Sequence, residues 1–159
     1  DRMFAADAYH RNYEPDIHRR LCALIDDDIF IVADDLDICS GGTRRLYFHI
    51  DDPHTHIENG VAHAGNVNVI LPQGLGYTVE KGAKSPRNDV KIETSRIIVT
   101  DGSDCASPLY LTVFTTRSDI SDCRIFRHGD EVITEFSKSG SRCRLTWKFG
   151  QSAEYLSEE

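Results

Sequence analysis

The chain lacks an excess of positive charge and any apolar run long enough to cross a bilayer. Its 26 acidic residues outnumber its 18 basic residues, so the formal net charge is −8. Proteins that bind nucleic acid neutralise phosphates with clustered lysine and arginine, and the tight basic clusters are limited to Arg19-Arg20 and Arg44-Arg45. We therefore expect neither a nucleic-acid partner nor a membrane partner.

Motifs for covalent catalysis and for a disulfide framework are also missing. No Gly-x-Ser-x-Gly elbow and no Cys-x-x-Cys pair occurs. The five cysteines form an odd set without regular spacing, so a disulfide stays open without being specified. We expect two of them, which lie in strand-like runs, to behave as small buried apolar side chains. The five are Cys22, Cys39, Cys105, Cys123 and Cys143, and the two are Cys22 and Cys143.

Alternation of apolar and polar residues is the strongest pattern that the chain does have. In residues 44–50, Tyr47 and His49 alternate with three apolar side chains, as in a strand with one buried face. No segment sustains a helical period, and about ten short strands follow one another. This predicts an all-β fold, a multi-stranded antiparallel β-sandwich. We expect one domain over residues 1–159, with residues 1–15 as an extended approach segment.

Turn signals divide the predicted strands into hairpins. Asp26-Asp27-Asp28 separates two apolar runs, and Asn59-Gly60 is typical of a two-residue hairpin turn. Residues 123–149 indicate three strands joined by short turns, which is a C-terminal antiparallel meander. Residues 72–89 are rich in glycine and proline, so we expect mainly loop there, around a short strand at residues 77–80.

Histidines supply one candidate metal site. His54-Thr55-His56 has the His-x-His spacing that points both rings to one side of a strand. Pro53 and the neighbouring acids are typical of a solvated turn, however, and a metal site would need a third ligand. We keep a metal-dependent enzyme that uses His54 and His56 as an alternative.

Basic residues in the predicted strands supply a candidate cleft. Several of them could line one cationic face for a sugar acid, but cross-strand pairs with aspartates would explain the same residues. Asp34-Asp35 reads as a strand leaving the core for a turn. The residues of the candidate face are His18, Arg19, Arg20, Arg44, Arg45 and His49, with Tyr13 and Tyr47 as nearby aromatics.

Four strand patterns carry a resemblance to a known family. Tyr13 precedes Ile17-His18-Arg19-Arg20, and residues 29–36 read Ile-Phe-Ile-Val-Ala-Asp-Asp-Leu. Residues 46–50 then give an aromatic-His strand, and residues 108–114 a strand that ends in Thr-Val-Phe. In order and spacing, these patterns resemble the C-terminal β-sandwich domain of heparinase II/III-like polysaccharide lyases.

The resemblance implies a super-sandwich and a role inside a bacterial, periplasmic or secreted lyase that acts on acidic, uronate-containing glycans. In such lyases an upstream helical toroid holds the catalytic Tyr and Asn or His. The early β-domain carries a His-x-His-x-Asp-x-x-Ser segment with the metal ligands. That segment is missing here, because Ile57-Glu58-Asn59 follows His56.

We therefore expect an excised C-terminal portion of a larger protein that is inactive alone and lacks the catalytic residues. No cofactor is expected in this chain, although the parent lyase would bind a divalent metal upstream. The expected partners are the toroid, an acidic polysaccharide and a second copy in a homodimer. Tyr47, His49 and Arg20 are the candidates for the edge of the cleft. The rival hypothesis is a stand-alone carbohydrate-binding or adhesion module.

Overall fold

The computed structural model describes residues 2–38, 42–88 and 90–158, and all regular structure in these ranges is β-strand. None of these residues forms a helix that could cross a membrane. Cys39, most of the turn expected at residues 40–42 and the side chain of Tyr13 lie outside the described residues. The predicted all-β class is confirmed.

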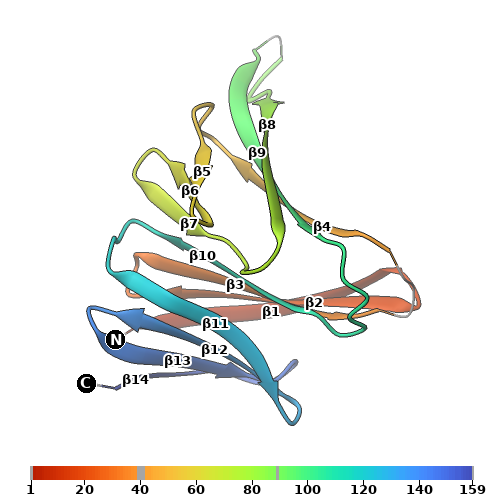
Figure 1. Cartoon of the computed structure of the whole chain (residues 1–159), viewed down its shortest axis with the longest axis vertical. Coiled ribbons are helices and arrows are strands. Elements are labelled where there is room, and N and C mark those ends of the chain that lie inside the picture. The colour runs from red at the N-terminus through yellow and green to blue at the C-terminus, as the bar shows by residue number, and fades with distance from the viewer. Residues whose placement is uncertain (1, 39–41, 89, 159) are drawn as a thin grey trace.

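A seven-stranded antiparallel sheet forms the central layer (Figure 1). Its outer pair, β1 and β2, is hydrogen-bonded from the Met3–Ile25 pair to the Tyr13–Asp16 pair, so the segment expected to approach the fold is mostly an edge strand. The strand order is β1 (Met3–Tyr13), β2 (Asp16–Ile25), β3 (Ile29–Asp37), β10 (Leu109–Thr115), β7 (Val67–Ile70), β6 (Val61–Ala64) and β5 (His56–Glu58).

A four-stranded meander covers one face of the central sheet. It contains β11 (Ile120–His128), β12 (Glu131–Lys138), β13 (Ser141–Trp147) and β14 (Glu154–Glu158), so the predicted meander is confirmed and extended by one strand. Apolar side chains from both sheets form the larger core. It includes Leu21, Ile31, Val113, Val132, Phe136, Leu145 and Trp147.

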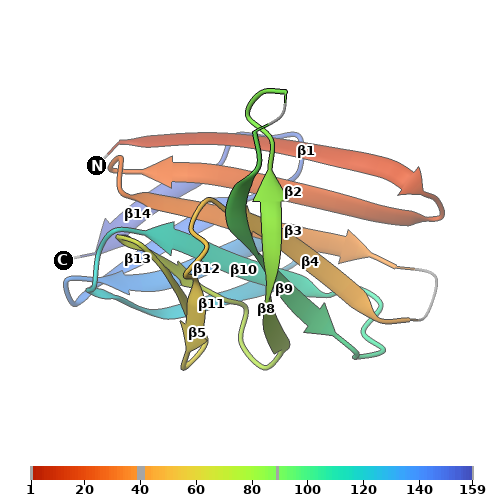
Figure 2. The same ribbon diagram turned by 90° about the horizontal axis from the view of Figure 1, so that it is seen from above.

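A three-stranded sheet covers part of the opposite face. It contains β4 (Arg44–Ile50), β9 (Ile92–Asp101) and β8 (Gly76–Lys84), and Figure 2 shows β8 and β9 crossing over the strands of the central sheet. Alternate residues of β10 serve the two cores: Val113 belongs to the first, whereas Phe114 packs on the second. The rings of Phe114 and Phe48 lie 5.6 Å apart. The three layers therefore form a sandwich with two cores.

The tight hairpins follow from residues that tolerate positive φ. Asp26 and Asp27 have φ of 49° and 64° in the β2–β3 turn, and Asn59 and Gly60 have 50° and 79° in the β5–β6 turn. Two consecutive residues with positive φ match the right-handed twist of the flanking strands. Both predicted hairpins are confirmed.

The expectation of mainly loop at residues 72–89 is wrong, because β8 extends from Gly76 to Lys84 and pairs with β9 throughout. Gly82 is one of the glycines on which the expectation of a loop rested. Its role is close packing: a Cβ at this position would lie 2.7 Å from Thr94 Oγ1 on β9. Glycine here permits the pairing of two strands instead of interrupting it.

Four of the five cysteines lie in the described residues, and all four are free thiols. Cys143 is fully buried in the larger core, as predicted, whereas Cys22 is only half-buried. Burial raises the pKa of the Cys123 thiol to about 12, which keeps it protonated and unreactive near neutral pH.

Candidate functional site

Tyr47 and His49 lie on the outward face of the three-stranded sheet. Leu46 and Phe48 alternate with them on β4 and are buried against the central sheet. Tyr47 is 47% exposed, and its ring centroid is 5.5 Å from the Arg96 guanidinium. Because Arg96 is paired with His49 in the β4–β9 register, these three side chains form one exposed patch.

Arg20, the third cleft candidate, belongs to the central sheet and is bound to a buried carboxylate. Its Nε donates to Asp34 Oδ1 at 2.6 Å, and its Nη2 donates to Oδ2 at 3.0 Å. His18 Nε2 lies 2.5 Å from the same Oδ1. Asp34 is fully buried, so Arg20 compensates a charge that water cannot reach. The structure thus places Arg20 on a different sheet from Tyr47 and His49.

Two further arginines of the candidate cationic face, Arg19 and Arg44, are also paired with aspartates. Arg19 lies 3.8 Å from Asp35, and Arg44 lies 3.2 Å from Asp101. The reading of Asp34-Asp35 as an exit to a turn is wrong, since Asp35 is 5% exposed and lies inside β3. Cross-strand pairing therefore accounts for Arg19, Arg20 and Arg44, so these three do not form a free cationic groove. Arg45 is exposed on β4, opposite Thr100 of β9.

His54 lies in the turn before β5, and His56 is the first residue of β5. The His54 amide donates to Asp52 Oδ1 at 2.8 Å, which shapes the turn. The ring of His56 lies 5.2 Å from that of His63, and His63 Nδ1 is 2.9 Å from Asn68 Oδ1. Within the described ranges, no cluster of three potential ligands is present. A metal site at these histidines stays a prediction, and metal analysis of the purified protein would test it.

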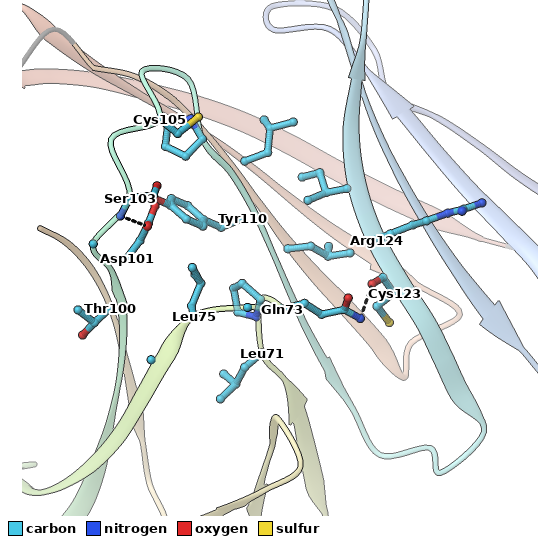
Figure 3. Close-up of a pocket in the computed structure, with 18 residues that line it drawn as sticks. Leu71, Gln73, Leu75, Thr100, Asp101, Ser103, Cys105, Tyr110, Cys123 and Arg124 are labelled. Carbon is cyan, nitrogen blue, oxygen red and sulfur yellow. Dashed lines mark hydrogen bonds between the residues drawn. The ribbon is translucent and has the colours of Figure 1, made fainter. Parts of the chain in front are cut away.

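A cavity of about 610 Å³ lies between the three-stranded sheet and β11 (Figure 3). The loop that follows β7 contributes Leu71, Gln73 and Leu75 to its walls, and β11 contributes Cys123 and Arg124. Gln73 crosses the floor and donates its amide to the Cys123 carbonyl at 3.3 Å. The cavity is therefore mainly apolar in the middle and polar at its two ends.

Asp101 and Tyr110 form the polar end nearest to β9. The Tyr110 hydroxyl donates to Asp101 Oδ2 at 2.6 Å, and the Ser103 amide donates to Oδ1 at 2.7 Å. Burial opposes ionisation of Asp101, but these hydrogen bonds outweigh it and hold its pKa below the ordinary value. Burial and the same hydrogen bond raise the pKa of Tyr110. Tyr110 is therefore a fixed hydrogen-bond donor and not a base at neutral pH.

Sequence reasoning did not find this pair. Asp101 ends β9 and Tyr110 lies in β10, and the loop between them contains Gly102 and Pro108. Only the packing of β10 against the three-stranded sheet brings the two side chains together. No local motif marks them.

Comparisons with known proteins identify the class of fold. No protein-family model and no curated protein matches the sequence. A heparinase III structure matches with a TM-score of 0.80 and 14% identity over 92% of this chain. The heparan sulfate lyase HepC from Pedobacter heparinus matches with a TM-score of 0.71 and 8% identity over 94% of it.

These likenesses confirm the predicted resemblance at the level of the fold. The chain has the fold of a β-sandwich portion of heparinase III and HepC, and it spans about a quarter of their length, 26% in each case. A mutant of HepC gives the same result, with a TM-score of 0.72 and 9% identity over 98% of this chain.

Proposed function

We propose that the chain is an accessory β-sandwich domain of a heparinase II/III-like polysaccharide lyase that acts on acidic, uronate-containing glycans. The observation that carries this proposal is the likeness to heparinase III, with a TM-score of 0.80 over 92% of the chain. The matched portion is about a quarter of a lyase chain, which suits one domain of a larger protein.

The contacts of the candidate residues favour an accessory role rather than a catalytic one. Elimination next to a uronate carboxylate requires a base, an acid and a group that neutralises the carboxylate, all within reach of one sugar. Arg20 is bound to Asp34, and Tyr110 is bound to Asp101. Tyr47 and His49 lie on another surface, beside Arg96. We therefore assign the catalytic residues and the divalent metal to an upstream helical toroid.

In this proposal, Tyr47 and His49 contact the substrate at the edge of the cleft. The exposed Tyr47 ring suits a sugar, because it can pack on the apolar face of the sugar. Arg96 beside it is already paired with Glu80, so the ring and His49 make the contact in this proposal. The parent protein would be bacterial, periplasmic or secreted, and dimeric. The toroid would be the main partner of this domain.

The experiment compares the isolated chain with the longer gene product that contains it. Ultraviolet absorbance of the double bond formed by elimination is recorded on heparan sulfate and on hyaluronan. We expect elimination by the longer protein and none by the isolated chain. Elimination by neither protein, together with glycan binding by the isolated chain, would favour the rival hypothesis of a stand-alone binding module.

A variant of the longer protein tests the role of the exposed patch. Tyr47→Ala is expected to raise KM several-fold with little change in kcat, because the ring contacts substrate away from the reacting atoms. Lys84→Gln is the control, since Lys84 pairs with Asp51 at the far end of β8. An unchanged KM for Tyr47→Ala would remove this residue from the cleft.

A further inference from the structure

Three arginines surround one glutamate on the outward face of the four-stranded sheet. In the strand register, Glu135 of β12 lies between Arg124 of β11 and Arg144 of β13. Arg142 is two residues from Arg144, so its side chain lies on the same face. Phe136 points the other way, into the larger core. The cluster therefore lies on a different sheet from Asp101 and from the patch of Tyr47.

The three guanidiniums share a single carboxylate. Arg124 Nε donates to Glu135 Oε2 at 2.6 Å, and Arg142 Nη2 donates to Oε1 at 2.6 Å. Arg144 donates to Oε1 through Nε at 2.9 Å and through Nη2 at 2.6 Å. Each guanidinium has five N–H donors, so most donors of the cluster are not used by Glu135.

The exposed fractions of the four side chains show which charge a ligand would meet. The side chains of Arg124, Arg142 and Arg144 are 60%, 50% and 43% exposed, whereas that of Glu135 is 2% exposed. The carboxylate thus lies beneath the guanidiniums and holds them in place. A ligand that approaches this face meets N–H donors and positive charge.

Two further acids lie near the cluster. Asp122 accepts hydrogen bonds from the hydroxyls of Ser121 at 2.9 Å and Ser137 at 3.0 Å. Glu158 stands opposite Arg142 in the β13–β14 ladder. The two hydrogen bonds and, after them, the charge of Arg124 lower the pKa of Asp122, so this acid interacts electrostatically with the cluster. In the described part of the chain, no direct ion pair joins Asp122 or Glu158 to the three arginines. The cluster keeps its donors in a chain whose overall charge is negative.

A groove leads to the cluster along β11. A second cavity, of about 470 Å³, is lined by Glu135, Arg142 and the acid Asp122. It shares Gln73, Cys123 and Arg124 with the larger cavity. The two cavities therefore adjoin at this part of β11. Figure 3 shows Arg124 extending away from the larger cavity, whose walls include leucine side chains. An apolar wall followed by guanidiniums suits an elongated ligand with apolar faces and anionic groups.

We propose that this groove binds an acidic oligosaccharide, with its sulfate or carboxylate groups on Arg124, Arg142 and Arg144. The class of ligand rests on the proposed function. A domain of such a lyase would meet the substrate of the lyase, which is an acidic glycan. Arginine suits these groups because its planar fork binds two oxygens at once. The groove would hold the polymer at a second place, away from Tyr47.

The test is calorimetric titration of a heparan sulfate hexasaccharide into the 159-residue chain. We expect the double variant Arg124→Gln, Arg142→Gln to bind at least tenfold more weakly than the unmodified chain. Lys84→Gln removes the same kind of charge from a distant strand and should bind normally. Titration with the desulfated hexasaccharide separates sulfate recognition from carboxylate recognition, and a neutral cellohexaose should not bind.

Arg144→Gln is the milder variant, because Glu135 keeps two partners and the fold is retained. We expect about threefold weaker binding, with an unchanged circular dichroism spectrum. Equal binding by the unmodified chain and both arginine variants would overturn the inference, as would a lack of binding by the unmodified chain. Neither result bears on elimination by the longer protein, so the proposed function would stand or fall separately.

Discussion

Two buried carboxylates on different sheets are neutralised in different ways. Asp34 of the central sheet is bound by the fork of Arg20 and by His18. Glu135 of the four-stranded sheet is bound by three arginines, although it carries the same single charge. Both carboxylates are almost inaccessible to water, since the side chains of Asp34 and Glu135 are 0% and 2% exposed.

The difference separates a structural ion pair from a binding surface. The guanidinium of Arg20 donates to both carboxylate oxygens of Asp34. Removal of Arg20 would leave a buried charge with few partners. Three arginines on Glu135 are more than its stability requires, so we expect the fold to tolerate the loss of one. The unused donors are then available to a ligand. The number of arginines per buried carboxylate thus indicates a structural role at Asp34 and a binding role at Glu135.

The largest effect is expected at Asp34. Arg20→Ala removes the bidentate partner of a fully buried carboxylate, and we expect the free energy of unfolding to fall by about 3 kcal/mol. Urea denaturation followed by tryptophan fluorescence measures this change. The double variant Arg20→Ala, Asp34→Asn should recover part of the loss, because the buried charge is then gone. A loss below about 1 kcal/mol for the single variant would break the comparison.

A smaller effect is expected at Glu135. Arg142→Ala leaves Arg124 and Arg144 on the carboxylate, and its side chain is half exposed. We expect a loss of about 0.5–1 kcal/mol in the same urea experiment. A fall in the free energy of unfolding as large as that of Arg20→Ala would mean that all three arginines are needed for folding. That result would contradict the view that their unused donors are available to a ligand.

The pH dependence of stability sharpens the comparison further. Burial opposes ionisation of Glu135, but hydrogen bonds from Arg144, Arg124 and Arg142 outweigh it and lower its pKa below the ordinary 4.5. A depressed pKa stabilises the fold above the unfolded value, and this contribution is lost as pH falls through the folded value. The stability difference between the unmodified chain and Glu135→Gln should therefore shrink below about pH 4.5. A constant difference between pH 3 and pH 7 would contradict this.

Local signals predicted the parts of the fold that depend on neighbouring residues. The acidic turn at residues 26–28 and the Asn59-Gly60 turn were predictable, because tolerance of positive φ depends on the residue type alone. The extent of β8 could not be predicted in this way. Gly82 is required by Thr94 on another strand, and the pairing of β3 with β10 joins segments that are far apart in sequence.

The candidate site was less predictable, because its contacts depend on register between strands. Arg20 meets Asp34 only through the pairing of β2 with β3. The cluster at Glu135 did leave a signal. Arg142 and Arg144 have strand spacing, and the predicted meander made their strand the neighbour of the strand that contains Glu135. Counting the arginines that face one buried acid would have identified the cluster.

The salt dependence of glycan binding tests most directly whether the spare guanidiniums at Glu135 contact acidic groups. Dissociation constants for the heparan sulfate hexasaccharide are measured at several salt concentrations, because salt screens exposed charges. The account predicts that binding by the unmodified chain weakens steeply with salt and that the double variant Arg124→Gln, Arg142→Gln shows a much flatter dependence. The same salt dependence in both proteins would contradict it.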